Sequence, residues 1–314
     1  MRVIDRDEVA HRLGHAQCIA LVREAMIALA QGRSRQLLRG ILDLGDGDLF
    51  GSMPGALDGA GFGAKLVSVF PSAAATGRSH QGVIVLFDRD SGAPACVVDA
   101  GEVTAIRTAC ASAAATDALA RSDATMLAIL GTGEQARHHA LALRHVRALS
   151  RIAVWGRDIG KARDIARRMS AETGVPARAF DSVREAVRDA DIVCAVSAAS
   201  EPILHFDDVA AGTHVNAVGS SRAGPVEIDP LFVSRACFFP DHREGVLAQG
   251  AEVLRALAEG SATQADVGPD IGHVLAGEAP GRTDPREVTV YKSLGSIVQD
   301  LACAAWLRGT AEPA

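Results

Sequence analysis

The chain has 314 residues, 48% of them hydrophobic and 22% charged, which is typical of a globular protein with one large domain or two ordinary ones. A formal net charge of −6 argues against a basic surface for nucleic acid or an anionic membrane, and no apolar run is long enough to span a bilayer. Because the start lacks a signal-peptide pattern and the six cysteines form no C-x-x-C pair, we expect a cytoplasmic protein with reduced thiols.

The first third of the chain predicts two helices followed by short strands. Residues 5–12 and 16–31 have helical patterns, and Gly32 lies just past the second. The strand-like segments are 36–44, 48–53, 62–70, 83–87 and 95–99, with turn signals at 45–47, 54–55 and 90–92. This pattern indicates an antiparallel or mixed sheet with hairpins, and the alanine-rich helix predicted at 101–119 leads out of this first domain.

From residue 124 onward, strand-like and helix-like segments alternate. Strands are predicted at 126–130, 152–155, 191–196, 215–218 and 236–239, and helices at 134–146, 159–171, 182–189 and 252–259. Such alternation indicates a parallel, doubly wound sheet with crossover helices. The final segment, 288–307, ends in a helix with regularly spaced apolar residues, which we expect to pack back on the first domain.

The first strand and helix of this region enclose a dinucleotide-binding pattern. The turn reads G-x-G-x-x-A, formed by Gly131, Gly133 and Ala136. The first glycine permits the sharp turn, the second lets the backbone approach a pyrophosphate, and the alanine lets the helix pack closely on the strand. The N-terminus of the helix then attracts the phosphates; the alternative is merely a tight turn. The predicted contacts are Gly131, Thr132, Gly133, Glu134 and Gln135.

The end of the second predicted strand bears on which dinucleotide binds. An NAD site usually has an acidic residue there, about 20 residues beyond the glycines, that bonds the ribose 2′-hydroxyl. Here the strand ends in Gly156, Arg157 and Asp158. An arginine suits a 2′-phosphate, so the sequence favours NADPH, with NADH as the alternative, although Arg157 could face solvent and Asp158 could cap the next helix or reach the ribose. Ser197 and Gly219, at the ends of later strands, are further predicted cofactor contacts.

Five segments in the same order resemble the ornithine cyclodeaminase/μ-crystallin family. They are GAKLVSVFP (63–71), VTAIRTACASAAA (103–115), LAILGTGEQARHH (127–139), VGSSRAGPVEID (218–229) and YKSLGSIVQDLA (291–302). The resemblance implies an α/β fold in which a doubly wound Rossmann domain, 119–291, is inserted in an α+β substrate-binding and dimerisation domain, 1–118 plus 292–314. It also implies a homodimer.

The resemblance places the family's carboxylate-binding cations at Arg39, Lys65 and Arg107. The chemistry of these side chains agrees, because a guanidinium holds a carboxylate with two parallel hydrogen bonds and a nearby ammonium adds charge. Without the resemblance, each is as readily a structural cation, which needs a partner if it is buried. Lys65 could also supply a proton to an imine nitrogen if burial lowers its pKa. His80 is a weaker substrate-binding candidate that could equally be a solvated loop residue.

Ser221 marks a departure from the cyclodeaminases. The resemblance places there an aspartate that, in cyclodeaminases, handles the substrate amine, and a neutral serine cannot act as that base. The S-S-R loop is instead similar to that of μ-crystallin, whose members reduce ketimines. Ser221 therefore joins Lys65 and Arg107 as a predicted catalytic residue, although loop packing would also explain it. Three polar residues interpreted mainly as structural are Lys292, Gln299 and Asp300.

The sequence thus predicts an NADPH-dependent reductase of cyclic imino acids such as Δ1-pyrroline-2-carboxylate and Δ1-piperideine-2-carboxylate, forming L-proline or L-pipecolate. The alternatives are an ornithine cyclodeaminase, an amino-acid dehydrogenase acting on linear imines, and a non-catalytic NADPH-binding protein. The expected partners are a small imino or amino acid and a second copy of the chain, with no metal, nucleic acid or membrane.

Overall fold

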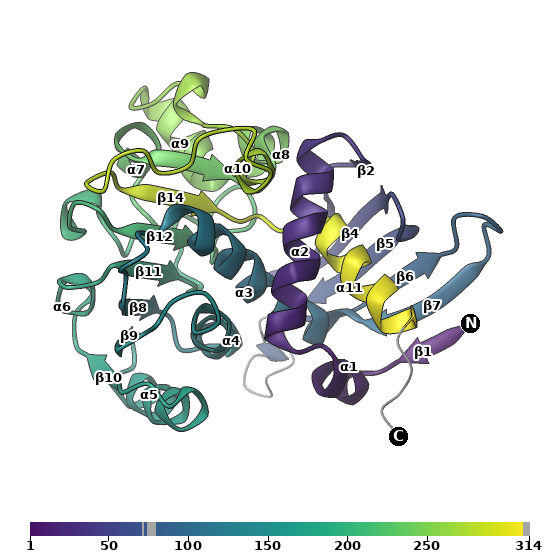
Figure 1. Ribbon diagram of the computed structural model, residues 1–314, viewed down its shortest axis with the longest axis horizontal. Coiled ribbons are helices and arrows are strands. Elements are labelled where there is room, and N and C mark those ends of the chain that lie inside the picture. The colour runs from purple at the N-terminus through teal and green to yellow at the C-terminus, as the bar shows by residue number, and fades with distance from the viewer. Residues whose placement is uncertain (71, 74–79, 310–314) are drawn as a thin grey trace. The chain divides into compact units, whose positions relative to one another are not determined.

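The chain forms two compact units (Figure 1). The computed structural model describes residues 1–70, 72–73 and 80–309, except the side chain of His80. Unit 1 comprises Met1–Arg107 and Ser296–Ala314, and unit 2 comprises Thr108–Gly295.

The first division falls inside helix α3 (Ala100–Leu119), not at its end. The second falls just before α11 (Ile297–Gly309). The family resemblance suggests divisions after residues 118 and 291. It does not reveal where a continuous helix changes the elements it packs against.

Unit 1 is built on a mostly antiparallel sheet with the order β1-β7-β6-β5-β4-β2, in which β3 also pairs with β4. Its strands are β1 (Arg2–Ile4), β2 (Ser34–Gln36), β3 (Gly40–Gly45), β4 (Asp48–Leu57), β5 (Gly61–Val69), β6 (His80–Phe87) and β7 (Pro94–Asp99). The pairing of β1 with β7 is parallel, and the other strands pair antiparallel. The strand predicted at 36–44 is therefore wrong in detail, because two strands, β2 and β3, share that segment.

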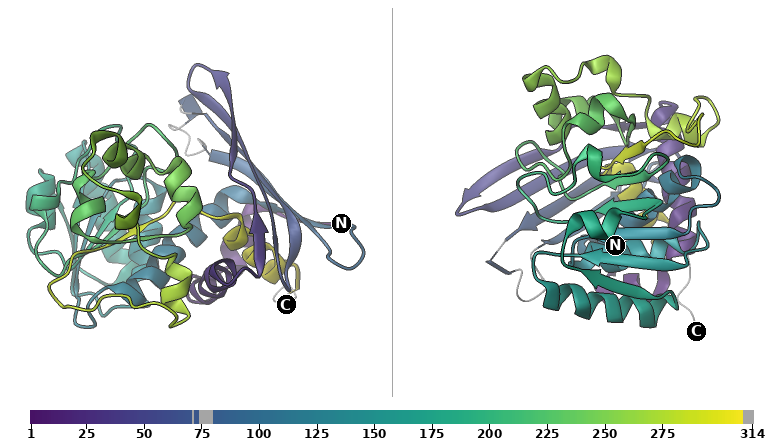
Figure 2. Two further views of the ribbon diagram at one scale, coloured as in Figure 1. Left: turned by 90° about the horizontal axis from the view of Figure 1, so that it is seen from above. Right: turned by 90° about the vertical axis from the view of Figure 1, so that its left-hand side faces the viewer.

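The helices of unit 1 are α1 (Arg6–Arg12), α2 (His15–Ala30) and α11. Helix α1 begins at Asp5, whose side chain accepts a hydrogen bond from the Glu8 backbone N–H at 2.9 Å. Helices α2 and α11 lie side by side, and α11 packs on β4 to β7, so the final helix packs on the first part of the chain as its apolar spacing predicts (Figure 1). Both helices lie on the same side of the sheet, and neither covers its opposite face (Figure 2).

Among the described residues, no single helix is long and apolar enough to cross a membrane. Helices α1 and α2 would be long and apolar enough only if they are taken together, and the chain bends by 93° where they join.

Unit 2 is built on a parallel sheet with the order β10-β9-β8-β11-β12-β14-β13. Its strands are β8 (Met126–Leu130), β9 (Arg151–Trp155), β10 (Ala177–Phe180), β11 (Ile192–Ala195), β12 (His214–Ala217), β13 (Cys237–Pro240) and β14 (Thr289–Lys292). The strand order reverses between β8 and β11, which is the switch point of a doubly wound sheet. The predicted doubly wound fold is therefore confirmed.

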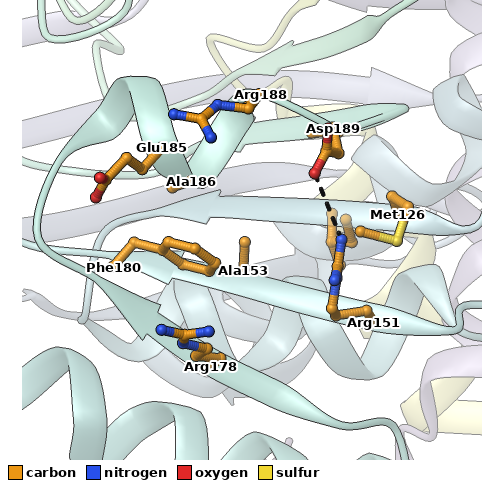
Figure 3. Close-up of a pocket in the computed structure, with 11 residues that line it drawn as sticks. Met126, Arg151, Ala153, Arg178, Phe180, Glu185, Ala186, Arg188 and Asp189 are labelled. Atoms are coloured by element: carbon orange, nitrogen blue, oxygen red, sulfur yellow. Dashed lines mark ion pairs between the residues drawn. The ribbon is translucent and has the colours of Figure 1, made fainter.

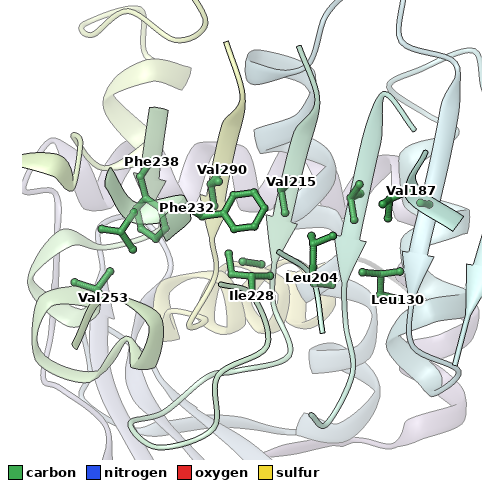
Figure 4. Packing of buried hydrophobic residues seen from close by; sticks show 14 of the residues in the cluster. Leu130, Val187, Leu204, Val215, Ile228, Phe232, Phe238, Val253 and Val290 are labelled. Carbon is green, nitrogen blue, oxygen red and sulfur yellow. The ribbon is translucent and has the colours of Figure 1, made fainter. Parts of the chain in front are cut away.

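Helices cover both faces of this sheet (Figure 2). They are α4 (Glu134–Leu143), α5 (Ile159–Thr173), α6 (Val183–Val187), α7 (Leu231–Arg235), α8 (Arg243–Gln249), α9 (Ala251–Glu259) and α10 (Ile271–Leu275), with short 3₁₀ turns at Phe206–Asp208 and Gln264–Asp266. Along β8, Leu127 and Ile129 pack toward α4 and α5, whereas Leu130 belongs to the opposite core with Val187 and Phe232 (Figure 4). Because both faces are covered, the two central strands β8 and β11 are wholly apolar.

Candidate functional site

The loop between β8 and α4 has the geometry of a phosphate-binding turn. Gly131 has a φ of +144°, and a β-carbon there would lie 2.7 Å from the Val196 backbone oxygen, so glycine alone fits without strain. Gly133 caps α4 with extended backbone and without a side-chain hydrogen bond. A β-carbon at Gly133 would meet no protein atom within 4 Å, so the protein itself does not require glycine there. The open space and the positive end of α4, beginning at Glu134 and Gln135, fit a pyrophosphate.

The loop that follows β9 lies against this turn. A β-carbon at Gly156 would collide with the methyl group of Thr132, so the two loops are in contact. Asp158 caps α5, because its Oδ1 accepts hydrogen bonds from two backbone N–H groups of the first turn at 2.8 and 3.1 Å. Arg157 is exposed. Of the two roles that the sequence allows for Asp158, the structure shows the helix cap.

The loops that follow β11 and β12 are joined by Glu227. One carboxyl oxygen of Glu227 accepts a hydrogen bond from the Ser197 backbone N–H, and the other accepts one from the Gly219 N–H at 2.8 Å. Burial raises the pKa of the Glu227 carboxyl to about 7, although these hydrogen bonds and the charge of Lys292 lower it. Ser221 follows in the same loop and is half-buried.

The predicted cofactor contacts therefore come together in space. All of them lie in loops, or in the first turn of α4, at the carboxyl edge of β8, β9, β11 and β12, on both sides of the switch point. They are Gly131, Thr132, Gly133, Glu134, Gln135, Gly156, Arg157, Asp158, Ser197 and Gly219. A dinucleotide binds across this edge in doubly wound folds.

Unit 1 contains a buried cluster of charged side chains. Asp300 Oδ1 accepts a hydrogen bond from Arg107 Nε at 3.1 Å and forms an ion pair with Lys65 Nζ at 3.4 Å. Arg107 Nη1 also donates to Gln299 Oε1 at 3.0 Å. All four side chains are buried. Because two cations share one carboxylate, the cluster has an excess of positive charge that suits a bound anion.

The charge on Lys65 is tuned by its surroundings. Burial lowers the pKa of Lys65 to about 8; Asp300 opposes this shift, and the positive charges of Arg107 and Arg39 add to it. Arg39 lies half-buried in the segment between β2 and β3. Lys65 therefore lies within electrostatic range of both arginines that the resemblance assigns to the carboxylate clamp.

Two atoms of this cluster have unused hydrogen-bonding capacity. Among the described residues, neither Gln299 Nε2 nor Asp300 Oδ2 has a hydrogen-bond partner, and both atoms are buried. Leaving a buried polar group unsatisfied costs about 1–3 kcal/mol, so a polar ligand that reaches them gains from pairing with them. The sequence alone suggests mainly structural roles for both residues. The available signal was an amide next to a carboxylate inside the otherwise apolar stretch of α11.

His80 and Ser221 are the remaining predicted site residues. His80 begins β6 and its backbone is in register with Val69, but its side chain lies outside the described residues. Ser221 belongs to unit 2, whereas Lys65 and Arg107 belong to unit 1. The three predicted catalytic residues are thus drawn from both units.

A hollow of about 240 Å³ lies between α6, β9 and β10 (Figure 3). Phe180 and Arg178 lie on its strand side, and Arg151 forms an ion pair with Asp189 at 3.7 Å. None of the predicted site residues lines it. Among the described residues, no group of three or more His, Cys, Asp or Glu side chains could hold a metal ion.

Known proteins are similar to this chain in both sequence and fold. The model of the ornithine cyclodeaminase/mu-crystallin family matches residues 2–313. A Δ1-pyrroline-2-carboxylate reductase of Bacillus cereus is 32% identical over 258 residues, which cover 81% of this chain and 79% of that protein. The ketimine reductase mu-crystallin of Mus musculus is 34% identical over 241 residues, covering 76% and 73% respectively.

A solved structure is similar over nearly the whole chain. The Δ1-pyrroline-2-carboxylate reductase of Thermococcus litoralis, in complex with NADH and L-proline, superposes with a TM-score of 0.95 at 29% identity and covers 98% of this chain and 96% of that one. The match of the family model is equally extensive. The chain therefore belongs to the ornithine cyclodeaminase/mu-crystallin family.

Proposed function

We propose that this protein is an NAD(P)H-dependent reductase that converts cyclic imino acids, Δ1-pyrroline-2-carboxylate or Δ1-piperideine-2-carboxylate, into L-proline or L-pipecolate. The observation that carries the proposal is the buried cluster in which Lys65 and Arg107 share the single carboxylate of Asp300. The names of the similar reductases support the same reaction class. All six cysteines are free thiols, five of them buried, which supports a cytoplasmic setting.

Unit 2 supplies the cofactor site in this proposal. The Gly131–Gly133 turn and the start of α4 would hold the pyrophosphate, and the loops after β11 and β12 would hold the nicotinamide half. Because the Oδ1 atom of Asp158 is engaged in capping α5, the exposed Arg157 is the residue suited to the 2′ position. A guanidinium there favours the 2′-phosphate of NADPH, with NADH as the second choice.

Unit 1 supplies the substrate-binding groups. Arg39 and Arg107, with Lys65 beside them, bind the substrate carboxylate, and Asp300 holds Lys65 and Arg107 in place. When bound, the cofactor supplies the hydride that reduces the C=N bond. Lys65 donates the proton to nitrogen. Its pKa of about 8 keeps it mostly protonated at neutral pH and yet ready to release the proton. Ser221 replaces the base that ammonia release would need.

The first test is oxidation of NADPH, followed by absorbance, with the two cyclic imines in parallel and NADH for comparison. Rapid oxidation supports the reductase, and the faster ring identifies the preferred substrate. Oxidation with linear imines alone would identify an amino-acid dehydrogenase instead. Ammonia release from ornithine without net cofactor oxidation would identify a cyclodeaminase.

The clamp is tested by Arg107→Ala, which removes the forked donor. We expect imine reduction to fall about 100-fold or more while NADPH affinity stays unchanged, because a charged pair at a substrate carboxylate contributes roughly 3 kcal/mol or more. Arg107→Lys is the matched control, which keeps the charge and loses the fork; it should recover only part of the rate. Wild-type rates in Arg107→Ala would contradict the clamp.

A further inference from the structure

Glu227 is a buried carboxyl group next to the loops that follow β11 and β12, at the carboxyl edge of the sheet of unit 2. Its side chain is 1% exposed, yet no arginine among the described residues forms an ion pair with it. Its two oxygens instead accept hydrogen bonds from backbone N–H groups of two different loops, at Ser197 after β11 and at Gly219 after β12. One carboxyl group therefore ties together two segments that are separated by more than twenty residues of chain.

The two loops pack closely against each other and against Glu227. A β-carbon at Gly219 would collide with both the Ser197 backbone oxygen and the Glu227 carboxyl oxygen. Any larger residue at 219 would therefore force the loops apart. The contact is a close fit of three groups.

A second buried contact holds the neighbouring residue. Lys292, at the end of β14, donates a hydrogen bond to the Ser220 backbone oxygen at 2.6 Å and forms an ion pair with Glu252 at 2.7 Å. Glu252 and Lys292 are completely buried, and the Glu227 backbone N–H lies 3.5 Å from a Glu252 carboxyl oxygen. The charged or titratable groups that face Glu227 are Lys292, Glu252 and the buried Cys194 thiol. The positive charge of Lys292 thus stabilises the negative charge of two buried carboxyl groups, those of Glu252 and Glu227.

The strand order indicates what these loops carry. In a doubly wound sheet the two halves of a dinucleotide lie on opposite sides of the switch point. The glycine turn after β8 and the loop after β9 fit the pyrophosphate and the adenosine half. The loops after β11 and β12 therefore remain for the nicotinamide half.

We propose that Glu227 is a positioning residue for the nicotinamide half of the cofactor, because its carboxylate fixes the Ser197 and Gly219 loops as one surface, while Lys292 fixes Ser220 beside it. This inference rests on the proposed function for its choice of cofactor. Glu227 does not touch the reacting atoms. It acts through the backbone of the two loops.

The hydrogen bonds that Glu227 accepts from the two loops depend on pH. A carboxylate accepts hydrogen bonds through both oxygens, whereas a protonated carboxyl group has one oxygen converted to a donor. Burial raises the pKa of Glu227 to about 7, so protonation begins as the pH falls through neutrality. One of the two loop contacts then weakens. The affinity for the nicotinamide half should fall with it.

The test compares two ligands on the full-length protein by titration calorimetry. One is NADPH, and the other is 2′-phospho-ADP-ribose, which lacks the nicotinamide ring. Glu227→Gln replaces one acceptor oxygen with a donor of the same size. We expect it to weaken NADPH binding about tenfold, to leave binding of the fragment within about twofold, and to give NADPH the same pH dependence as the fragment. Glu244→Gln, at an exposed position of α8, is the matched control and should change nothing.

Equal weakening of both ligands in Glu227→Gln would mean a general structural role and would overturn the proposal, as would no weakening of either. The wild-type protein provides a second measurement that needs no variant. Lowering the pH from about 8 to about 6 should weaken NADPH more than the fragment, and an equal response would also overturn the proposal. Binding is measured without turnover, so a protein that passes these tests but reduces no imine fails only the proposed function.

Discussion

Lys65 lies where burial and charge act in opposite directions. Burial and the neighbouring guanidinium groups favour its neutral form, whereas Asp300 favours the ammonium, and the result is a pKa of about 8. An exposed lysine would remain protonated and could not release its proton near neutral pH. The same side chain can therefore attract the substrate carboxylate and deliver a proton.

The pH dependence of turnover tests this role. If protonated Lys65 is the proton donor, kcat should fall as the pH rises through about 8. Because the folded protein releases this proton more readily than the unfolded chain, with its ordinary value of 10.5, this titration increases stability between about 8 and 10.5. A loss of rate in that range is then not caused by unfolding linked to Lys65.

Stopped-flow rates of imine reduction across this range provide the measurement. Lys65→Arg keeps the positive charge but cannot deprotonate in the same range, so it should lose both the alkaline limb and most of the rate. An alkaline limb that is unchanged in Lys65→Arg would assign the titration to another group.

At the level of single residues, the sequence located the cations but not their partner. Lys65 and Arg107 stand in short motifs that the family resemblance picks out. Asp300 comes from a segment 193 residues beyond Arg107, and its local signal, a carboxylate beside an amide in an otherwise apolar stretch, does not identify its partner. Long-range pairing of this kind depends on how α11 packs on the sheet, which the residues near Asp300 do not encode.

At the level of elements, two adjacent residues before α5 are expected to have different roles: Asp158 caps the helix, and Arg157 binds the 2′-phosphate of the cofactor. Asp158→Ala removes the N-cap of α5 and should lower the free energy of unfolding by about 1 kcal/mol, measured by urea denaturation. It should leave the ratio of NADPH to NADH affinity unchanged. Arg157→Ala is the matched neighbour: we expect unchanged stability and a loss of preference for NADPH of about tenfold. If Asp158→Ala shifts the preference instead, the carboxylate reaches the ribose.

Elements were predictable where local and tertiary preferences agree. Asp5 caps α1, and the G-x-G-x-x-A segment forms the tight turn between β8 and α4; both are local motifs. The turn expected at Pro54-Gly55 is wrong, since both residues continue β4 and pair with Ala64 and Gly63. A β-carbon at Gly55 would meet the Arg35 backbone oxygen at 3.0 Å and collide with the Ile297 side chain, so tertiary packing explains this glycine.

Short elements were also missed for a physical reason. Strand β10 has only four residues and carries Arg178, so its alternation is weak, and α7 and α10 have five residues each. A periodic pattern needs two or more turns before it stands out. These elements are stabilised by the sheet they pack on.

At the scale of the whole molecule, apolar exposure is unevenly distributed. Among the described residues, the large hydrophobic side chains that remain exposed lie in unit 1. Phe50 and Val83 lie on the face of the sheet that α2 and α11 leave open, with Leu66 on the strand between them, along a groove of about 640 Å³. Exposed apolar patches of this kind usually mark an interface.

We therefore propose that a second copy of the chain covers this face. Val83→Lys places a charge in the centre of the patch, where desolvating it would cost several kcal/mol, so at one concentration we expect this variant to sediment as a monomer and the wild type as a dimer. Ala171→Lys adds the same charge on an exposed turn of α5 in unit 2 and should leave the dimer intact. A wild-type protein that sediments as a monomer at micromolar concentration would contradict the proposal. If the Val83→Lys variant remained dimeric, the dimer interface would have to lie on another surface.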